Sequence, residues 1–186
     1  MQGGGSPACI AFFSTAECTL WYDRAPMTEP QVSPADVRRH FAGYPFGEPC
    51  TEDQLARAES LLRQPIPPVL RRLYLDFNGF LGPTNASFFW PLCDPKPGDI
   101  ALVEMNRFFR DETVFPQELT SKCLFYGDAG IGGQWGLKND LPGKIILWNA
   151  EWGEDYEVVG TDLLQVWVAQ KQEYDVLASQ QRSGQA

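Results

Sequence analysis

Apolar side chains recur at helical spacing in the part of the chain that follows residue 50. Within residues 51–63 they share one face of a helix, the members being Leu55, Ala58, Leu61 and Leu62. Thr51 and Gln54 have the spacing of a capping box, in which both side chains satisfy backbone N–H groups at the helix start. The pattern therefore predicts a helix over residues 51–63.

A second helix is predicted directly after a proline-rich corner at residues 65–68. Proline fits the first turn of a helix, because its nitrogen would have no intrahelical partner there. The apolar stripe continues through residues 69–77, and Asn78-Gly79 ends it with residues that tolerate positive φ. A shorter helix is predicted upstream, at residues 33–41.

Beyond residue 79 the pattern changes to short apolar clusters separated by glycine, proline, asparagine and aspartate, which is typical of strands joined by turns. Strands of one meander are predicted at residues 87–92, 123–126, 134–137, 145–148 and 156–159. Residues 99–110 are instead predicted to be helical, with the following side chains mostly on one side: Ile100, Val103, Met105, Phe108 and Phe109. A closing helix is predicted from Thr161 or Asp162 onward. This order predicts an α+β fold, with helices packed on one mainly antiparallel sheet.

The composition indicates a folded domain and excludes two classes of direct partner, nucleic acid and membranes. Of the 186 residues, 44 % are hydrophobic and 13 % aromatic, which is too much apolar material for a disordered chain. Lys+Arg is 15 against Asp+Glu 24, so the net charge is −9 and repels nucleic-acid backbones and anionic bilayers. No run approaches the roughly 20 apolar residues of a membrane-spanning helix. We therefore expect no direct nucleic-acid or membrane partner.

The cysteines and the N-terminal segment favour a cytoplasmic protein. The five cysteines are widely spread and lack a C-x-x-C pair, the set being Cys9, Cys18, Cys50, Cys93 and Cys123. We therefore expect reduced thiols and no zinc site. The first cation is Arg24, so the basic region of a secretory signal is missing. The predicted division is an N-terminal extension with a short helix (1–45), the main domain (46–179) and a tail (180–186), and residues before Met27 are a candidate segment outside the core.

Two ordered stretches carry a resemblance to a known family. The first combines Thr51-Glu-Asp-Gln-Leu, Pro65-Ile-Pro-Pro and Leu73-Tyr-Leu-Asp-Phe-Asn-Gly. The second combines Leu124-Phe-Tyr-Gly-Asp-Ala-Gly-Ile-Gly-Gly-Gln-Trp-Gly, Ile145-Ile-Leu-Trp and Tyr156-Glu-Val-Val-Gly. In this order they resemble the SUKH superfamily, which includes bacterial immunity proteins and the fungal Smi/Knr cell-wall regulators. The resemblance implies an α+β fold and a binding protein without a catalytic centre or cofactor.

Two motifs that suggest chemistry have simpler interpretations. The glycine-rich residues 127–133 lack the Walker Gly-Lys-Ser/Thr and precede a predicted strand, so a tight turn between strands is favoured over a phosphate loop. His40, the sole histidine, lies beside two arginines in a predicted helix and belongs to no catalytic or metal-binding pattern. We therefore predict neither a catalytic residue nor a metal or cofactor site.

Carboxylates and aromatic residues gather at the end of the predicted meander. The predicted partner-binding residues are Glu151, Trp152, Glu154, Asp155 and Glu157, with Asp128 and Asp140 as weaker additions, and ordinary solvated turns are the alternative interpretation of these carboxylates. Interface anchors are enriched in Trp and Tyr, and an acidic surface is complementary to a basic partner. Trp135 and Trp148 lie within strand patterns and are predicted to be core residues, whereas Trp152 is predicted to be exposed on a loop.

The sequence interpretation is therefore a non-catalytic immunity protein that binds a cognate bacterial toxin with a basic surface, a nuclease being one candidate. It would neutralise the toxin by covering its active or substrate-binding surface. A regulatory adaptor of the Smi/Knr type is the alternative from a second class. A hydrolase that uses two of the clustered carboxylates is the third.

Overall fold

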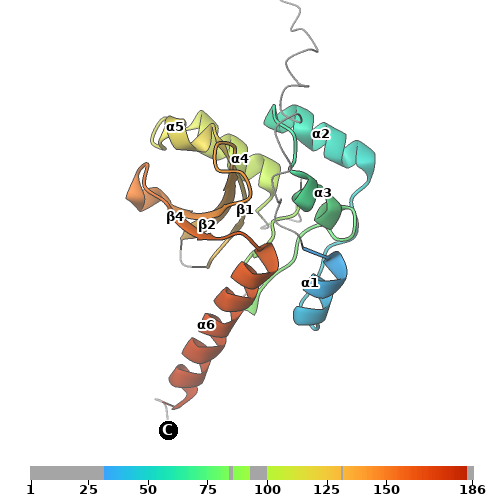
Figure 1. The fold of residues 1–186 in the computed structure, drawn as a ribbon, viewed down its shortest axis with the longest axis vertical. Helices are drawn as coiled ribbons and strands as arrows, with labels where there is room; N and C mark the ends of the chain where they lie inside the picture. Colours follow the sequence, from blue (N-terminus) through green and yellow to red (C-terminus); the bar gives the residue numbers. More distant parts are fainter. Residues whose placement is uncertain (1–31, 84–85, 93–99, 131, 184–186) are drawn as a thin grey trace, which may run out of the picture.

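The computed structural model describes residues 32–83, 86–92, 100–130 and 132–183. Its helices are α1 (Pro34–His40), α2 (Glu52–Leu62), α3 (Pro68–Tyr74), α4 (Leu102–Asp111), α5 (Gln117–Thr120), the 3₁₀ helix η3 (Ala150–Trp152) and α6 (Leu163–Ser183). Its strands are β1 (Cys123–Asp128), β2 (Gly133–Lys138), β3 (Ile145–Asn149) and β4 (Glu157–Gly160). The predicted α+β fold is confirmed (Figure 1). The segment before Met27, which the sequence placed as a candidate outside the core, lies outside the described residues.

The capping box that starts α2 is present as predicted. The Thr51 backbone N–H donates to Gln54 Oε1 at 2.8 Å, and the Gln54 backbone N–H donates to Thr51 Oγ1 at 3.2 Å. Leu55, Ala58 and Leu62 are buried on the face that the pattern indicated. Leu61, predicted on the same face, is 41 % exposed, because it lies one residue before Leu62 and so turns about 100° away on a helix of 3.6 residues per turn.

The four strands form an antiparallel meander in the order β1-β2-β3-β4. The two faces of this sheet bury different tryptophans, because successive side chains of a strand point to opposite faces. Trp148 contacts Phe109 of α4, whereas Trp135 contacts Phe88, with ring centroids 5.3 and 5.1 Å apart. Both tryptophans are almost fully buried, so their predicted place in the core is confirmed.

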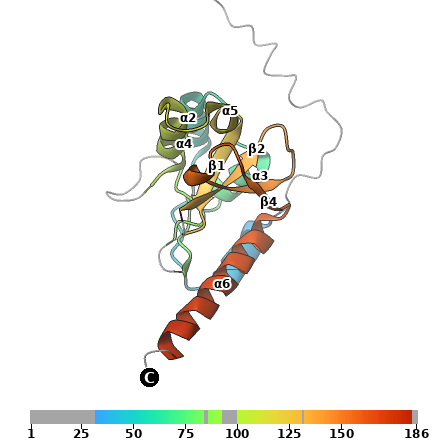
Figure 2. The same cartoon turned by 90° about the vertical axis from the view of Figure 1, so that its left-hand side faces the viewer.

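The longest helix, α6, closes the domain and then extends past it. Figures 1 and 2 both show its C-terminal half projecting away from the sheet. Trp167 in its first half packs on Phe80 and Phe89, with ring centroids 5.1 and 5.9 Å apart. The helix α1 lies beside this first half (Figure 2), and its Val37 is fully buried in the shared core. Within the described ranges, no helix is both long enough and apolar enough to cross a bilayer.

The segment 87–92 is not a strand of the sheet, and the prediction that it is one was wrong. It lies along the outer edge of β1 and makes two backbone hydrogen bonds there, from Trp90 N to Tyr126 O at 2.8 Å and from Asp128 N to Ser87 O at 2.9 Å. A continuous ladder does not form, because the Phe125 N–H and C=O on this edge are bound by Asn106 of α4. The register of β1 also shifts by a bulge just after Phe125.

The cysteines within the described ranges, Cys50 and Cys123, are both buried, and Cys123 is a free thiol. Burial raises the pKa of the Cys123 thiol to about 12. Because the thiolate is the reactive form, this thiol stays protonated and unreactive at neutral pH. The prediction of reduced thiols agrees with the free thiol of Cys123, and Cys9, Cys18 and Cys93 lie outside the described part of the chain.

Helix α6 also holds the turn between β1 and β2. Tyr174 Oη donates to the Ala129 carbonyl at 2.5 Å, and a Cβ atom on Gly130 would lie 1.6 Å from that hydroxyl oxygen. We expect Gly130→Ala to lower the free energy of unfolding by about 2–4 kcal/mol. Alanine is strained at the positive φ of this position, and its Cβ would displace the buried Tyr174 hydroxyl. Chemical denaturation of the purified chain measures this.

The matched control for this variant is Gly43→Ala. Gly43 also has positive φ, at +91°, but a Cβ there meets no atom within 4 Å. This variant should therefore lose only the backbone part, about 1 kcal/mol. Equal losses in the two variants would show that the contact between Tyr174 and the turn contributes nothing.

Candidate functional site

The connection from β3 to β4 carries most of the predicted binding residues and is tied to the sheet by hydrogen bonds. Asn149 Oδ1 accepts from the Glu151 backbone N–H at 3.0 Å and so caps η3. The buried Trp148 donates from Nε1 to the Gly153 carbonyl at 2.8 Å, and Asp155 N donates to Trp152 O at 3.2 Å. The loop therefore has a defined shape, although its side chains face solvent.

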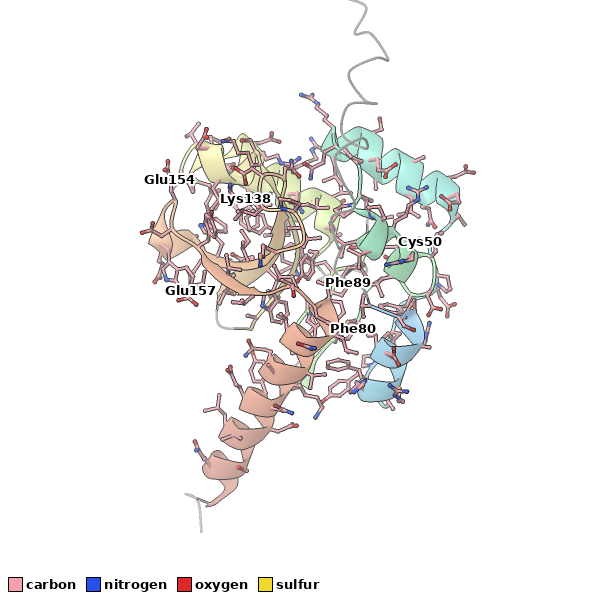
Figure 3. All side chains as sticks on the ribbon, in the orientation of Figure 1. Cys50, Phe80, Phe89, Lys138, Glu154 and Glu157 are labelled. Atoms are coloured by element: carbon pink, nitrogen blue, oxygen red, sulfur yellow. The ribbon has the colours of Figure 1, made fainter. Side chains whose placement is uncertain are left out.

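Four carboxylates of this segment are exposed together, those of Glu151, Glu154, Asp155 and Glu157. Within the described part of the chain none of them forms an ion pair, so no side chain there compensates their charge. Trp152, in the middle of them, is 39 % exposed, which confirms the predicted exposure of that residue. Figure 3 shows Glu154 and Glu157 on the same side of the molecule. We call Glu151, Trp152, Glu154, Asp155 and Glu157 the acidic face.

Asp128 does not join the acidic face, although it lies at the same end of the sheet. Its carboxylate is half-buried in the turn that follows β1, where Oδ1 accepts from the Gly130 N–H at 2.7 Å. Burial raises the pKa of Asp128, and the hydrogen bond from Gly130 works in the opposite direction. The Asp128 side chain thus organises the turn, as aspartate does in Asx turns.

Asp140 lies at the opposite end of the sheet, in the turn between β2 and β3. There its carboxylate is paired with Lys138, and this hydrogen bond lowers the pKa of Asp140. Lys138 also lies over the ring of Tyr156, with Nζ 5.7 Å from the centroid. The Lys138 side chain is largely buried, and Figure 3 shows its label well apart from that of Glu154. Asp140 therefore lies away from the acidic face, and Lys138 compensates its charge.

The structure adds exposed apolar residues that sequence reasoning did not place here. Phe108 of α4 is 48 % exposed and contacts Phe115, with ring centroids 5.2 Å apart. Phe115 in turn contacts Trp148, the residue that holds the β3–β4 loop. Val114, in the same connection between α4 and α5, is 79 % exposed. An apolar surface thus lies near the acidic face, since both rest on Trp148.

The prediction that placed Phe108 and Ile100 on the buried side of this helix was wrong. Ile100 is 42 % exposed, and Phe109 is the member of the aromatic pair that enters the core. Two consecutive helical residues point about 100° apart, so Phe108 and Phe109 cannot both face the sheet. The adjacent phenylalanines were the signal in the sequence that one of them had to be exposed.

The glycine-rich segment and His40 have the structural positions that the sequence predicted. The glycine-rich segment connects the consecutive antiparallel strands β1 and β2, as predicted, and His40 is exposed on α1, with its Nδ1 2.9 Å from the Asp36 carbonyl oxygen. Among the described residues no group of three or more His, Cys, Asp or Glu side chains is arranged to hold a metal ion. The acidic face is suited to bind a partner through its charge and through contact with Trp152.

A cleft of about 430 Å³ lies away from this loop, between the segments 45–49, 78–81 and 87–91. Its aromatic wall includes Phe46, Phe80 and Phe89, and Figure 3 shows Phe80 and Phe89 close together in the interior. Two of its polar groups already have partners, since Asn78 Oδ1 accepts from Leu92 N and Gln54 Oε1 accepts from Thr51 N.

Comparison with known proteins supplies the family. A search of curated proteins finds no match. The sequence pattern of the SMI1 / KNR4 family (SUKH-1) matches residues 49–167, which is more than half of the chain and runs from just before α2 into α6. The match includes the whole acidic face, and the α+β fold agrees with the one that the resemblance implied. The chain therefore belongs to the SMI1 / KNR4 family (SUKH-1).

Proposed function

We propose that this chain is a non-catalytic immunity protein that binds a cognate bacterial toxin through the acidic face and neutralises it by covering its active or substrate-binding surface. Membership of the SMI1 / KNR4 family (SUKH-1) is consistent with such a role. The observation that carries the proposal is a group of four exposed carboxylates around the half-exposed Trp152, none of which is ion-paired with a described residue.

The shape of the loop supports binding over an ordinary solvated turn. The hydrogen bonds from Trp148 and to Asn149 hold the segment 149–153 before any partner arrives. A preorganised loop loses less conformational entropy on binding, which leaves more of the contact energy as affinity. Exposed tryptophans are frequent binding hot spots, because a large rigid side chain fills a pocket at low entropic cost.

Charge supplies the selectivity in this proposal. The net charge of the chain is −9, and the acidic face adds a local concentration of that charge. A toxin that acts on nucleic acid needs a basic groove for its substrate, so the acidic face would be attracted to the same groove. Occupation of the groove blocks the substrate, and this inhibition requires no chemical step.

Reversing two charges of the acidic face, in a Glu154→Lys/Asp155→Lys variant, should slow association with the toxin. We expect the association rate constant at low salt to fall by about tenfold and its dependence on salt to weaken, because long-range attraction is lost. Stopped-flow mixing across a salt titration measures both.

The matched control reverses two carboxylates on α6, in a Glu173→Lys/Asp175→Lys variant, and changes the net charge by the same amount. Both residues are exposed, and α6 carries them on the projecting half of the helix. The control should retain most of the association rate. If the two double variants slow association equally, the overall charge and not the acidic face steers the encounter.

The partner itself is best sought in the neighbouring gene. The product of that gene should co-purify with this chain, and co-expression of this chain should protect cells from its toxicity. Binding without protection would instead favour the regulatory adaptor.

A further inference from the structure

A second cleft, of about 450 Å³, lies between the C-terminal end of α2 and the last turns of α4. We call it the arginine cleft because three guanidinium groups line it, those of Arg63, Arg107 and Arg110. Asp111 is the only carboxylate among its described lining residues. This local excess of positive charge stands out in a chain whose net charge is −9.

Arg110 forms one wall of the arginine cleft and is held rigidly. Its guanidinium donates to three carbonyl oxygens, at 2.8 Å to Leu62, 2.9 Å to Cys123 and 3.3 Å to Thr120. These bonds join α2, α4 and the start of β1, and no ion pair of Arg110 is present among the described residues. Burial lowers the pKa of Arg110, as expected for a cation that is partly removed from water without a paired carboxylate.

Arg63 and Arg107 are exposed at the same cleft and also form no ion pair within the described part of the chain. The presence of a cation at position 63 has a structural explanation, because a positive charge at the C-terminal end of α2 interacts favourably with the helix dipole. Arg107 lies in the middle of α4, where that explanation does not apply.

Neutral groups complete the cleft. Ser60 and Ser121 also line it, and Leu61, which is 41 % exposed, adds an apolar surface beside them. The two serine hydroxyl groups can each donate to an oxygen atom of a ligand.

We propose that the arginine cleft binds a phosphate group carried by a small molecule. A phosphate offers more acceptor oxygens than a carboxylate, which suits a donor set of guanidinium and hydroxyl groups. The volume is within the range of small-molecule sites and exceeds what inorganic phosphate fills, and Leu61 can contact the organic part of a phosphate ester. This site is separate from the acidic face and does not depend on the toxin proposal.

The test is a titration of the full chain with four probes: adenosine 5′-monophosphate, inorganic phosphate, adenosine and citrate. Binding is measured by calorimetry and by the NMR signals of the arginine Nε–H groups. We expect saturable binding of the first two probes, with shifts at Arg63, Arg107 and Arg110. Tighter binding of the monophosphate than of phosphate would identify an organic phosphate as the ligand, and equal binding would identify the free ion. Adenosine should not bind. Binding of citrate at the same affinity would overturn the assignment to phosphate.

Two variants locate the site, Arg63→Gln and Arg107→Gln, and each should weaken phosphate binding by about tenfold or more, because a charge-assisted hydrogen bond is lost. The matched control is Arg72→Gln, which removes the same charge from an exposed position on α3 outside the cleft. Its affinity should stay within about twofold of the unaltered chain. Absence of saturable binding, or equal weakening in all three variants, would overturn the proposal.

Discussion

Replacing Trp152 with alanine should weaken binding to the cognate toxin by about 2–4 kcal/mol, which corresponds to roughly 30- to 1,000-fold in Kd. Trp152 is 39 % exposed, its carbonyl accepts from the Asp155 N–H at 3.2 Å, and the bond from Trp148 Nε1 to the carbonyl of the next residue, Gly153, holds the loop. A rigid, partly exposed aromatic side chain at the centre of four carboxylates has the properties of an interface anchor. Titration calorimetry or surface plasmon resonance with the purified toxin measures the loss.

The stability of the Trp152→Ala variant should change little, since this side chain contributes less to the core than the buried Trp148. A second truncation, Leu177→Ala, is the matched control, because Leu177 is an exposed apolar residue on the projecting part of α6. Its Kd should match that of the unaltered chain. Full affinity of the Trp152→Ala variant would place the interface on another surface.

Replacing Asn106 with leucine should lower the free energy of unfolding by about 2–5 kcal/mol, because it leaves two buried backbone groups without partners. Asn106 is 1 % exposed. Its Nδ2 donates to the Phe125 carbonyl at 2.6 Å, and its Oδ1 accepts from the Phe125 N–H at 2.9 Å. The side chain thus acts as a short piece of strand on the open edge of β1. Urea denaturation measures the difference.

Leucine is close to asparagine in shape, so the Asn106→Leu variant isolates the lost hydrogen bonds from a change of volume. The same substitution at Asn139, an exposed residue of the β2–β3 turn, is the control and should change the stability by less than about 0.5 kcal/mol. A loss at Asn106 no larger than at Asn139 would mean that solvent satisfies Phe125 as well as the amide does.

Asn106 also explains why the segment 87–92 was mistaken for a strand. Its apolar residues have the composition of a buried strand, and Phe88, Phe89 and Trp90 are indeed buried. Pairing requires free backbone groups on the neighbouring strand, however, and a side chain from α4 already binds those of Phe125. No local pattern in residues 87–92 contains that information.

The residues predicted to bind a partner also divide into those that the sequence placed correctly and those that it did not. The exposure of Glu151, Trp152, Glu154, Asp155 and Glu157 was predictable, because polar residues and glycine interrupt the apolar clusters around them. Asp128 and Asp140 were grouped with them by proximity along the chain. The structure places Asp140 at the other end of the sheet beside Lys138, and it turns the Asp128 carboxylate toward the Gly130 N–H. Their surroundings depend on residues that the loop sequence does not include.

The arginine cleft depends even more on the tertiary structure, because its cations come from two helices that are distant in sequence. Arg63 ends α2, whereas Arg107 and Arg110 belong to α4, and the bond from Arg110 to the Leu62 carbonyl brings the two helices together. Each arginine alone has the pattern of an ordinary solvated helical residue. Their convergence was therefore not predictable from charge along the chain.

Sequence alone determined the elements whose signals are local: the capped helix α2, the proline-started helix α3, the four short strands and their order, and the acidic, aromatic character of the β3–β4 loop. Such signals depend on neighbouring backbone groups and on periodicity, which are present in a short window of residues. Only the tertiary structure decided which phenylalanine of α4 is exposed, which edge of β1 remains open and which carboxylates are compensated. Those outcomes depend on the burial and hydrogen bonding of groups that are brought together from distant parts of the chain.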